Sequence, residues 1–262
     1  MKTIILIHGA WQGSWAFDAW RPWLIASGWH VVAVDLPGNG WNAERLKPDG
    51  LAHYTAHVAQ ILAEQPGPCV VLGHSGGGLV ASQVAELLPD RVAALVYLVG
   101  MMLPSGMSFK DLVAAQRALV AGKRALVAGK PDDDFGGIVP HLEFTDGGAA
   151  TRVPVQAALD VFLHDCPPIA ATIAAHKLRP QLEAGRAVAN TLTPERFGRV
   201  PRVYVEALQD RSIDIRLQRA MQALTPGAAV VTCDCGHVPQ LAMPGPLTEL
   251  VCKTLARVVS QP

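Results

Sequence analysis

The sequence lacks an excess of charge of either sign and lacks a long hydrophobic run. Its 262 residues carry 22 Lys and Arg against 22 Asp and Glu, a balance that gives no support for a nucleic-acid partner or an anionic membrane surface. No apolar run approaches the roughly 20 residues that span a bilayer. The N-terminal apolar run, residues 3–7, is also shorter than the about 7–15 residues of a signal peptide's apolar region, so we expect a first strand there.

Cysteine is scarce, odd in number and scattered, at positions 69, 166, 233, 235 and 252. This pattern does not suit a disulfide framework and predicts reduced thiols in a cytoplasmic protein. Cys233, Cys235 and His237 could together suggest a metal site. They are too close in sequence to enclose a tetrahedral ion alone, and no second ligand pair stands elsewhere, so we expect no metal.

The chain does contain short apolar runs that alternate with helical patterns. Because the runs are continuous and rich in β-branched residues, they are typical of strands buried on both faces of a parallel sheet. Strand–helix alternation predicts an α/β fold with a doubly wound, mostly parallel sheet and right-handed crossovers. The expected strands are 2–7, 29–34, 69–72, 94–99, 202–207 and 229–232, and the expected helices are 16–27, 51–65, 79–88, 213–224 and 245–259.

One long segment interrupts this alternation. Between residues 103 and 199 no strand-like run occurs, and helical patches at 108–127, 153–163 and 168–176 are separated by turn-rich stretches. We therefore expect a core built from 1–100 and 200–262, with an inserted helical cap at 101–199. Within it the heptapeptide RALVAGK occurs in tandem at 117–123 and 124–130. Seven residues are close to two helical turns, so we expect a neutral extension of a cap helix away from the site.

Ser75 lies in the sequence GHSGG, which fits the G-x-S-x-G nucleophile elbow. An expected strand precedes it and an expected helix follows it, as this sharp turn requires. Glycines on either side let strand and helix pass closely, and the serine Oγ then projects at the carboxyl edge of the sheet. A serine hydroxyl in that place is a candidate nucleophile.

A serine nucleophile needs a base and a carboxylate that orients the base. His237 follows the last expected strand and is favoured among nine histidines. Asp210 follows the preceding strand, which gives the chain order Ser, Asp, His. Asp214 stays open as a rival, although a place in the first turn of the next helix explains it, and Asp234 is too near His237 to reach its ring easily.

An oxyanion hole needs two preorganised backbone N–H groups. The N–H of Gly76, directly after the nucleophile, is one candidate. The other is the N–H of Ala10, in the loop after the first strand. Trp11 follows Ala10 and could line the pocket, and we also expect Met101, Phe162 and Val238 to contact substrate.

Together the stretches IILIHGAWQGSWAFDAW, VVAVDLPGNG, VVLGHSGGGLVASQVAE, YVEALQDRSI and GHVPQLAMP resemble the α/β-hydrolase superfamily. More narrowly they are similar to the branch of plant methylesterases, hydroxynitrile lyases and small bacterial carboxylesterases. The resemblance spans about 2–100 and 200–258, and more weakly the cap. It implies Ser75 as nucleophile, His237 as base, Asp210 as its orienting acid and no cofactor. Many such proteins are dimers, so a homodimer is an expectation of the resemblance alone.

The expected activity is hydrolysis of a small hydrophobic carboxylic ester through an acyl-enzyme. A receptor for a small molecule on the same scaffold is an alternative. Cyanohydrin cleavage is another, but the lyases that this chain resembles carry Lys directly after the catalytic His and Thr directly after the His of the first strand. Here those positions hold Val238 and Gly9, and both absences favour the esterase.

Overall fold

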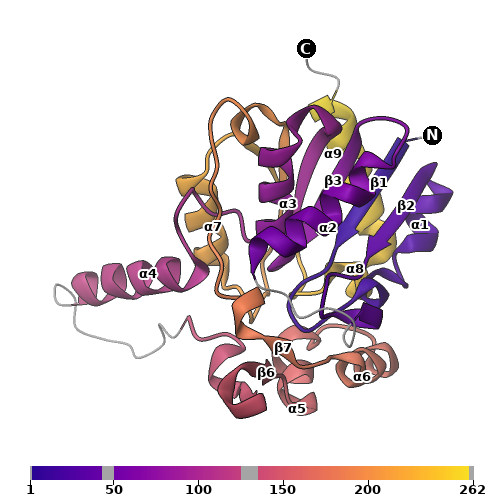
Figure 1. Ribbon diagram of the computed structural model, residues 1–262. Helices are drawn as coiled ribbons and strands as arrows, with labels where there is room; N and C mark the ends of the chain where they lie inside the picture. The colour runs from indigo at the N-terminus through magenta and orange to yellow at the C-terminus, as the bar shows by residue number, and fades with distance from the viewer. Residues whose placement is uncertain (1, 43–49, 125–134, 260–262) are drawn as a thin grey trace.

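The computed structural model describes residues 2–42, 50–124 and 135–259 (Figure 1). Six strands form one sheet in the order β2-β1-β3-β4-β8-β9, and every neighbouring pair is parallel. The inner strands are almost wholly buried, in keeping with their continuous Val, Ile and Leu runs. The strands are β1 Lys2–Ile7, β2 Trp29–Val34, β3 Cys69–His74, β4 Val92–Leu98, β8 Arg202–Ala207 and β9 Ala228–Cys233.

Helices cover both faces of this sheet. Helices α2 (Leu51–Ala63) and α3 (Gly77–Leu87) lie in front of it in Figure 1, and α1 (Arg21–Ala26) packs with α9 (Pro244–Val259) behind it. Helix α7 (Ile215–Leu224) packs on β8, and the short α8 (Pro239–Ala242) leads into α9. The predicted doubly wound α/β architecture is confirmed. Within the described ranges, no helix has both the length and the apolar character needed to cross a membrane.

Most of the segment between β4 and β8, including β5, β6, β7, α5 and α6, lies beyond the carboxyl ends of the strands, at the bottom of Figure 1, with α4 projecting to one side. The stretch before β8 returns along α3, where Thr193 and Arg196 bond to Glu86. The sequence predicts a helical cap here, but the segment also holds a three-stranded antiparallel sheet of β5, β6 and β7. Strands of two or three residues are too short to show alternation in the sequence. The segment comprises α4 Phe109–Arg124, β5 Glu143–Thr145, β6 Ala150–Arg152, α5 Val155–Ala157, a π-helical turn Ala158–Phe162, α6 Pro168–Lys177 and β7 Gln181–Leu182.

Two buried clusters hold these parts together. The larger lies on both faces of the main sheet. The smaller joins the inserted segment to the loop after β1 and includes Trp11, Ile138, Phe162 and Val238. The first RALVAGK copy lies in α4, whereas the second, at 124–130, falls almost entirely outside the described residues.

Candidate active site

Ser75 occupies the sharp turn between β3 and α3, with a left-handed φ of 51°. Its backbone is held by three hydrogen bonds, because its N–H donates to Leu98 O (3.2 Å) and its carbonyl accepts from the N–H groups of Gly78 (3.0 Å) and Met101 (2.8 Å). A side chain at Gly77 would place its Cβ 2.6 Å from the carbonyl oxygen of His8, so only glycine fits there. This unusual backbone angle, in a non-glycine residue, is the strained geometry of a nucleophile elbow.

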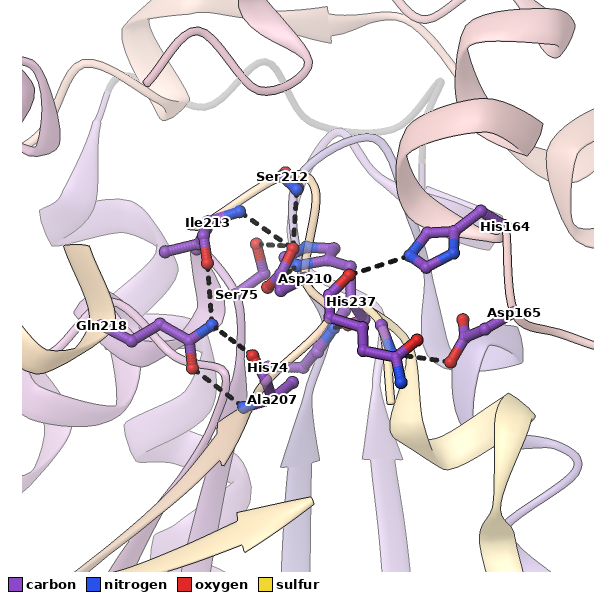
Figure 2. A network of polar contacts seen from close by, with 12 residues as sticks. His74, Ser75, His164, Asp165, Ala207, Asp210, Ser212, Ile213, Gln218 and His237 are labelled. Carbon is purple, nitrogen blue, oxygen red and sulfur yellow. Dashed lines mark hydrogen bonds and ion pairs between the residues drawn. The ribbon is translucent and has the colours of Figure 1, made fainter. Parts of the chain in front are cut away.

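His237 and Asp210 meet Ser75 in one line of hydrogen bonds (Figure 2). The Nε2 of His237 lies 3.1 Å from Ser75 Oγ, and its Nδ1 lies 2.8 Å from Asp210 Oδ2. The other carboxylate oxygen, Oδ1, accepts the backbone N–H groups of Ser212 (2.6 Å) and Ile213 (2.9 Å). Both side chains are buried, so the carboxylate is desolvated but fully hydrogen-bonded. The Nδ1–H of His237 donates to Asp210, which leaves Nε2 free to accept the Ser75 proton.

The rival carboxylates lie elsewhere. Asp214 caps α7, where its Oδ1 accepts the Arg216 N–H (2.8 Å), and it also pairs with the Arg216 guanidinium. Asp234 accepts a hydrogen bond from the side chain of Gln209 (2.7 Å). Asp210, rather than either rival, forms the hydrogen bond with His237.

Two further histidines near the elbow are buried and neutral. Burial, reinforced by the neighbouring His237, lowers the pKa of His74 from 6.5 to about 3. Its Nε2–H donates to the His237 backbone carbonyl (2.8 Å), so it supports the loop that carries His237. Burial also lowers the pKa of His8, whose Nδ1–H donates to Gly9 O (2.7 Å) and whose Nε2 accepts the Leu36 N–H (3.2 Å).

The two expected oxyanion donors lie side by side. A Cβ built on Gly76 would stand 3.9 Å from Ala10 N, which brings the first turn of α3 next to the loop after β1. Both residues line the same cavity as Ser75. Within the described residues, neither N–H is among the backbone donors engaged in turns and loops.

A cavity of about 500 Å³ opens above Ser75 and His237. Three of the four expected substrate contacts, Trp11, Met101 and Phe162, line it, and the Phe162 ring stacks on that of His237 with centroids 5.2 Å apart. The fourth, Val238, lines a smaller cavity of about 170 Å³ instead. Val238 immediately precedes α8 and belongs to the same buried cluster as Phe162, which corrects its expected place on the wall of the main cavity.

Sequence reasoning did not find several polar groups on the wall of the main cavity. Lys110 and Arg117 reach it from α4, and Glu183 and Arg186 reach it from the loop after β7. Arg186 pairs with Glu183 (3.0 Å) and lies over the Trp11 ring, 4.3 Å from its centroid. Lys110, Glu183 and Arg186 belong to no recognisable motif. Arg117 begins the first RALVAGK copy, so this copy reaches the cavity wall, which corrects the expectation that it lies away from the site. The seven-residue spacing of Lys110 and Arg117 places them on one face of α4.

The alternative of a metal site gains no support. All five cysteines are unpaired, and Cys233 and Cys235 are buried beside each other while His237 turns to Ser75 and Asp210. In the part of the chain that the structure describes, no group of three or more His, Cys, Asp or Glu side chains is placed to hold an ion.

An elbow serine, a histidine and a carboxylate at the carboxyl edge of a parallel sheet define an α/β-hydrolase fold. The sequence matches the description "Alpha/beta hydrolase family" over residues 4–250, and the chain belongs to this family.

Three similar proteins within this family indicate which branch the chain resembles. A pyrethroid hydrolase of Sphingobium wenxiniae is 33% identical over 256 residues, 96% of this chain and 86% of that protein. Methylesterase 7 of Arabidopsis thaliana is 26% identical over 95% of each chain. The crystal structure of a pyrethroid hydrolase from Sphingobium faniae superposes with a TM-score of 0.82 at 31% identity, covering 97% of each chain. These names agree with the predicted branch and enzyme class.

Proposed function

We propose that this protein is a carboxylic-ester hydrolase that works through a serine nucleophile and an acyl-enzyme. The observation that carries the proposal is the continuous line from Ser75 Oγ to His237 Nε2 (3.1 Å) and from His237 Nδ1 to Asp210 Oδ2 (2.8 Å). The names of the relatives, a pyrethroid hydrolase and a methylesterase, support ester hydrolysis as the reaction class.

In the first half of the reaction, Ser75 Oγ attacks the ester carbonyl carbon while His237 Nε2 takes the hydroxyl proton. Asp210 accepts the Nδ1–H throughout and stabilises the imidazolium. The carbonyl oxygen, now an oxyanion, receives hydrogen bonds from the N–H groups of Ala10 and Gly76. The tetrahedral intermediate collapses as His237 returns the proton to the leaving alkoxide, which departs as the alcohol.

In the second half, water replaces the alcohol. His237 removes a proton from the water, whose oxygen attacks the acyl carbon of the ester on Ser75. Collapse of the second tetrahedral intermediate releases the carboxylic acid and restores the Ser75 hydroxyl with the proton from His237.

The lining of the cavity supports a largely hydrophobic ester. Apolar side chains from several elements line the cavity that contains Ser75, namely Leu79, Met101, Val113, Phe135, Ile138 and Phe162. A cavity of about 500 Å³ has the size of a small-molecule site. The basic side chains on α4 lie on its wall, so they can face a polar end of such a substrate.

The test is Ser75-dependent turnover. Wild-type protein should hydrolyse p-nitrophenyl butyrate, and a fluorophosphonate probe should label the peptide that contains Ser75. Ser75→Ala should lose both, whereas the control Ser105→Ala, at an exposed serine of the inserted segment, should keep both. Equal turnover by wild type and Ser75→Ala would refute the proposal. A folded wild type that neither turns over nor reacts with the probe would point to a receptor.

The lyase alternative is tested separately with mandelonitrile at acidic pH, where its spontaneous decay is slow. The absence of a lysine at Val238 and of a hydroxyl at Gly9 predicts no serine-dependent benzaldehyde release. Release faster than ester hydrolysis would overturn the assignment.

A further inference from the structure

Two adjacent side chains of the inserted segment reach the loops that carry the base and the acid (Figure 2). Asp165 Oδ2 accepts the backbone N–H of Gly236 at 2.6 Å. His164 Nε2–H donates to the backbone carbonyl of Gln209 at 3.0 Å. Gly236 directly precedes the proposed base, and Gln209 directly precedes the proposed acid. One dipeptide therefore contacts both loops, one residue away from each catalytic side chain.

The same segment also holds the loop of the oxyanion donor. Trp11, which follows Ala10, has a left-handed φ of 61°. Its N–H donates to Gln181 Oε1 (2.7 Å), its carbonyl accepts the Arg179 N–H (3.0 Å), and its indole Nε1–H donates to Thr151 O (3.1 Å). All three polar groups of Trp11 thus have partners within the inserted segment.

Gln181 is itself fixed. It is buried on β7, and its Nε2–H donates to Tyr54 Oη (3.2 Å), which also accepts the Asn39 side-chain N–H (3.2 Å). The amide can therefore not turn without breaking a second buried hydrogen bond. Because an unmade buried hydrogen bond is costly, the acceptor for Trp11 N–H stays in place.

We propose that the inserted segment positions the catalytic groups as well as enclosing the substrate, with Asp165, His164 and Gln181 as positioning residues for the base, acid and oxyanion loops. The inference rests on the proposed function. A displacement of about 1 Å at a catalytic group can lower the rate about 100-fold. The three loops follow strands, and the hydrogen bonds between the strands end before the site, so other contacts must hold the loops in place. The inserted segment must then stay in contact with the three loops during turnover, and substrate must enter the cavity without displacing the segment.

The test at the base loop compares two substitutions of one side chain. Asp165→Ala removes the acceptor for Gly236 N–H and should lower kcat about tenfold or more, with KM within about twofold. Asp165→Asn keeps an oxygen acceptor in the same place and should restore kcat to within about threefold of wild type. The matched control is Asp160→Ala, which removes an exposed carboxylate of the same segment whose Oδ1 accepts a hydrogen bond from the Gln156 side chain and keeps the backbone carbonyl that accepts from Arg211. It should leave kcat unchanged.

The test at the oxyanion loop uses Gln181→Met, which keeps the side-chain length and removes the acceptor. It should lower kcat and raise the inhibition constant of an alkyl boronic acid, whose serine adduct places an oxygen in the oxyanion hole, by about tenfold each. KM should change little. Circular dichroism and thermal unfolding report whether each variant is folded, and His164→Ala replaces Asp165→Ala if the latter does not fold.

Wild-type kcat in folded Asp165→Ala and Gln181→Met would overturn the inference alone. A higher KM with unchanged kcat would also overturn it. So would a fall in kcat in Asp165→Asn as large as the fall in Asp165→Ala. Absence of Ser75-dependent turnover in the wild type would overturn the proposed function and this inference with it.

Discussion

Replacing Asp210 by Asn tests the proposed triad with almost no change in shape. Asp210 Oδ1 accepts two backbone N–H groups, from Ser212 and Ile213, and Oδ2 accepts Nδ1–H of His237. The Asn side chain has one acceptor oxygen, and we expect it to accept the two backbone N–H groups. The amide NH₂ then faces Nδ1, which must become an acceptor and push the ring proton onto Nε2.

An Nε2–H group cannot accept the proton of Ser75, which lies 3.1 Å away. We therefore expect a loss of kcat of about 10⁴-fold, the effect of this substitution in another serine triad, or about 5 kcal/mol of transition-state stabilisation. Initial rates with p-nitrophenyl butyrate at pH 7.5 measure it, with KM expected to change little.

Asp214→Asn is the matched control, because Asp214 caps α7 and asparagine is an equally good N-cap residue. Its kcat should stay within about twofold of wild type. More than a tenth of wild-type activity in Asp210→Asn, or a collapse of activity in Asp214→Asn, would refute this reasoning.

Three further substitutions probe packing around the site. In Gly9→Ala the new Cβ would lie 2.9 Å from Ser75 Cβ and 3.2 Å from His74 Nδ1, so kcat should fall at least about tenfold, and wild-type kcat would contradict the geometry. The pKa of His74 falls from 6.5 in the unfolded chain to about 3 in the folded protein because of burial. The unfolded state therefore binds the proton first, and stability falls as pH drops below about 6.5, by about 2 kcal/mol at pH 5 from His74 alone. Urea unfolding at pH 7.5 and pH 5 measures this difference in unfolding free energy, which should be smaller in His74→Gln. An equal difference in wild type and His74→Gln would contradict the role of His74. Phe162→Ala removes a buried ring that contacts Trp11 and His237 and should cost about 3–5 kcal/mol of unfolding free energy, whereas a cost under about 1 kcal/mol would contradict its packing role.

Much of the fold could be predicted because its signals are local. Three expected strands, Lys2–Ile7, Trp29–Val34 and Arg202–Ala207, have the observed bounds, and the other three differ by one or two residues at one or both ends. A continuous β-branched run needs burial on both faces wherever it occurs, so it indicates a parallel strand without knowledge of its partners. The match to the hydrolase family confirms this part of the analysis.

The candidate triad was also accessible from sequence, although its catalytic roles stay predictions. Ser75 sits in a motif whose spacing requires a particular turn, and Asp210 and His237 each follow a strand. Parallel strands end at the same edge, so residues just beyond them are expected to meet there. The sequence favours Asp210 over Asp214 by its place after the strand, and in the structure Asp210 contacts His237 whereas Asp214 caps α7.

The sequence by itself determined the strand–helix order, the elbow and the edge of the sheet where the site lies, because each depends on neighbours within a few residues. Only the tertiary structure decided that Val238 faces a second cavity, that β5, β6 and β7 form a small sheet, and that Asp165 and Gln181 bond to the loops beside His237 and Ala10. The last two contacts join residues 71 and 170 positions apart. Such pairings depend on how the inserted segment docks, and docking is set by the sum of many weak contacts that leave no periodic pattern along the chain.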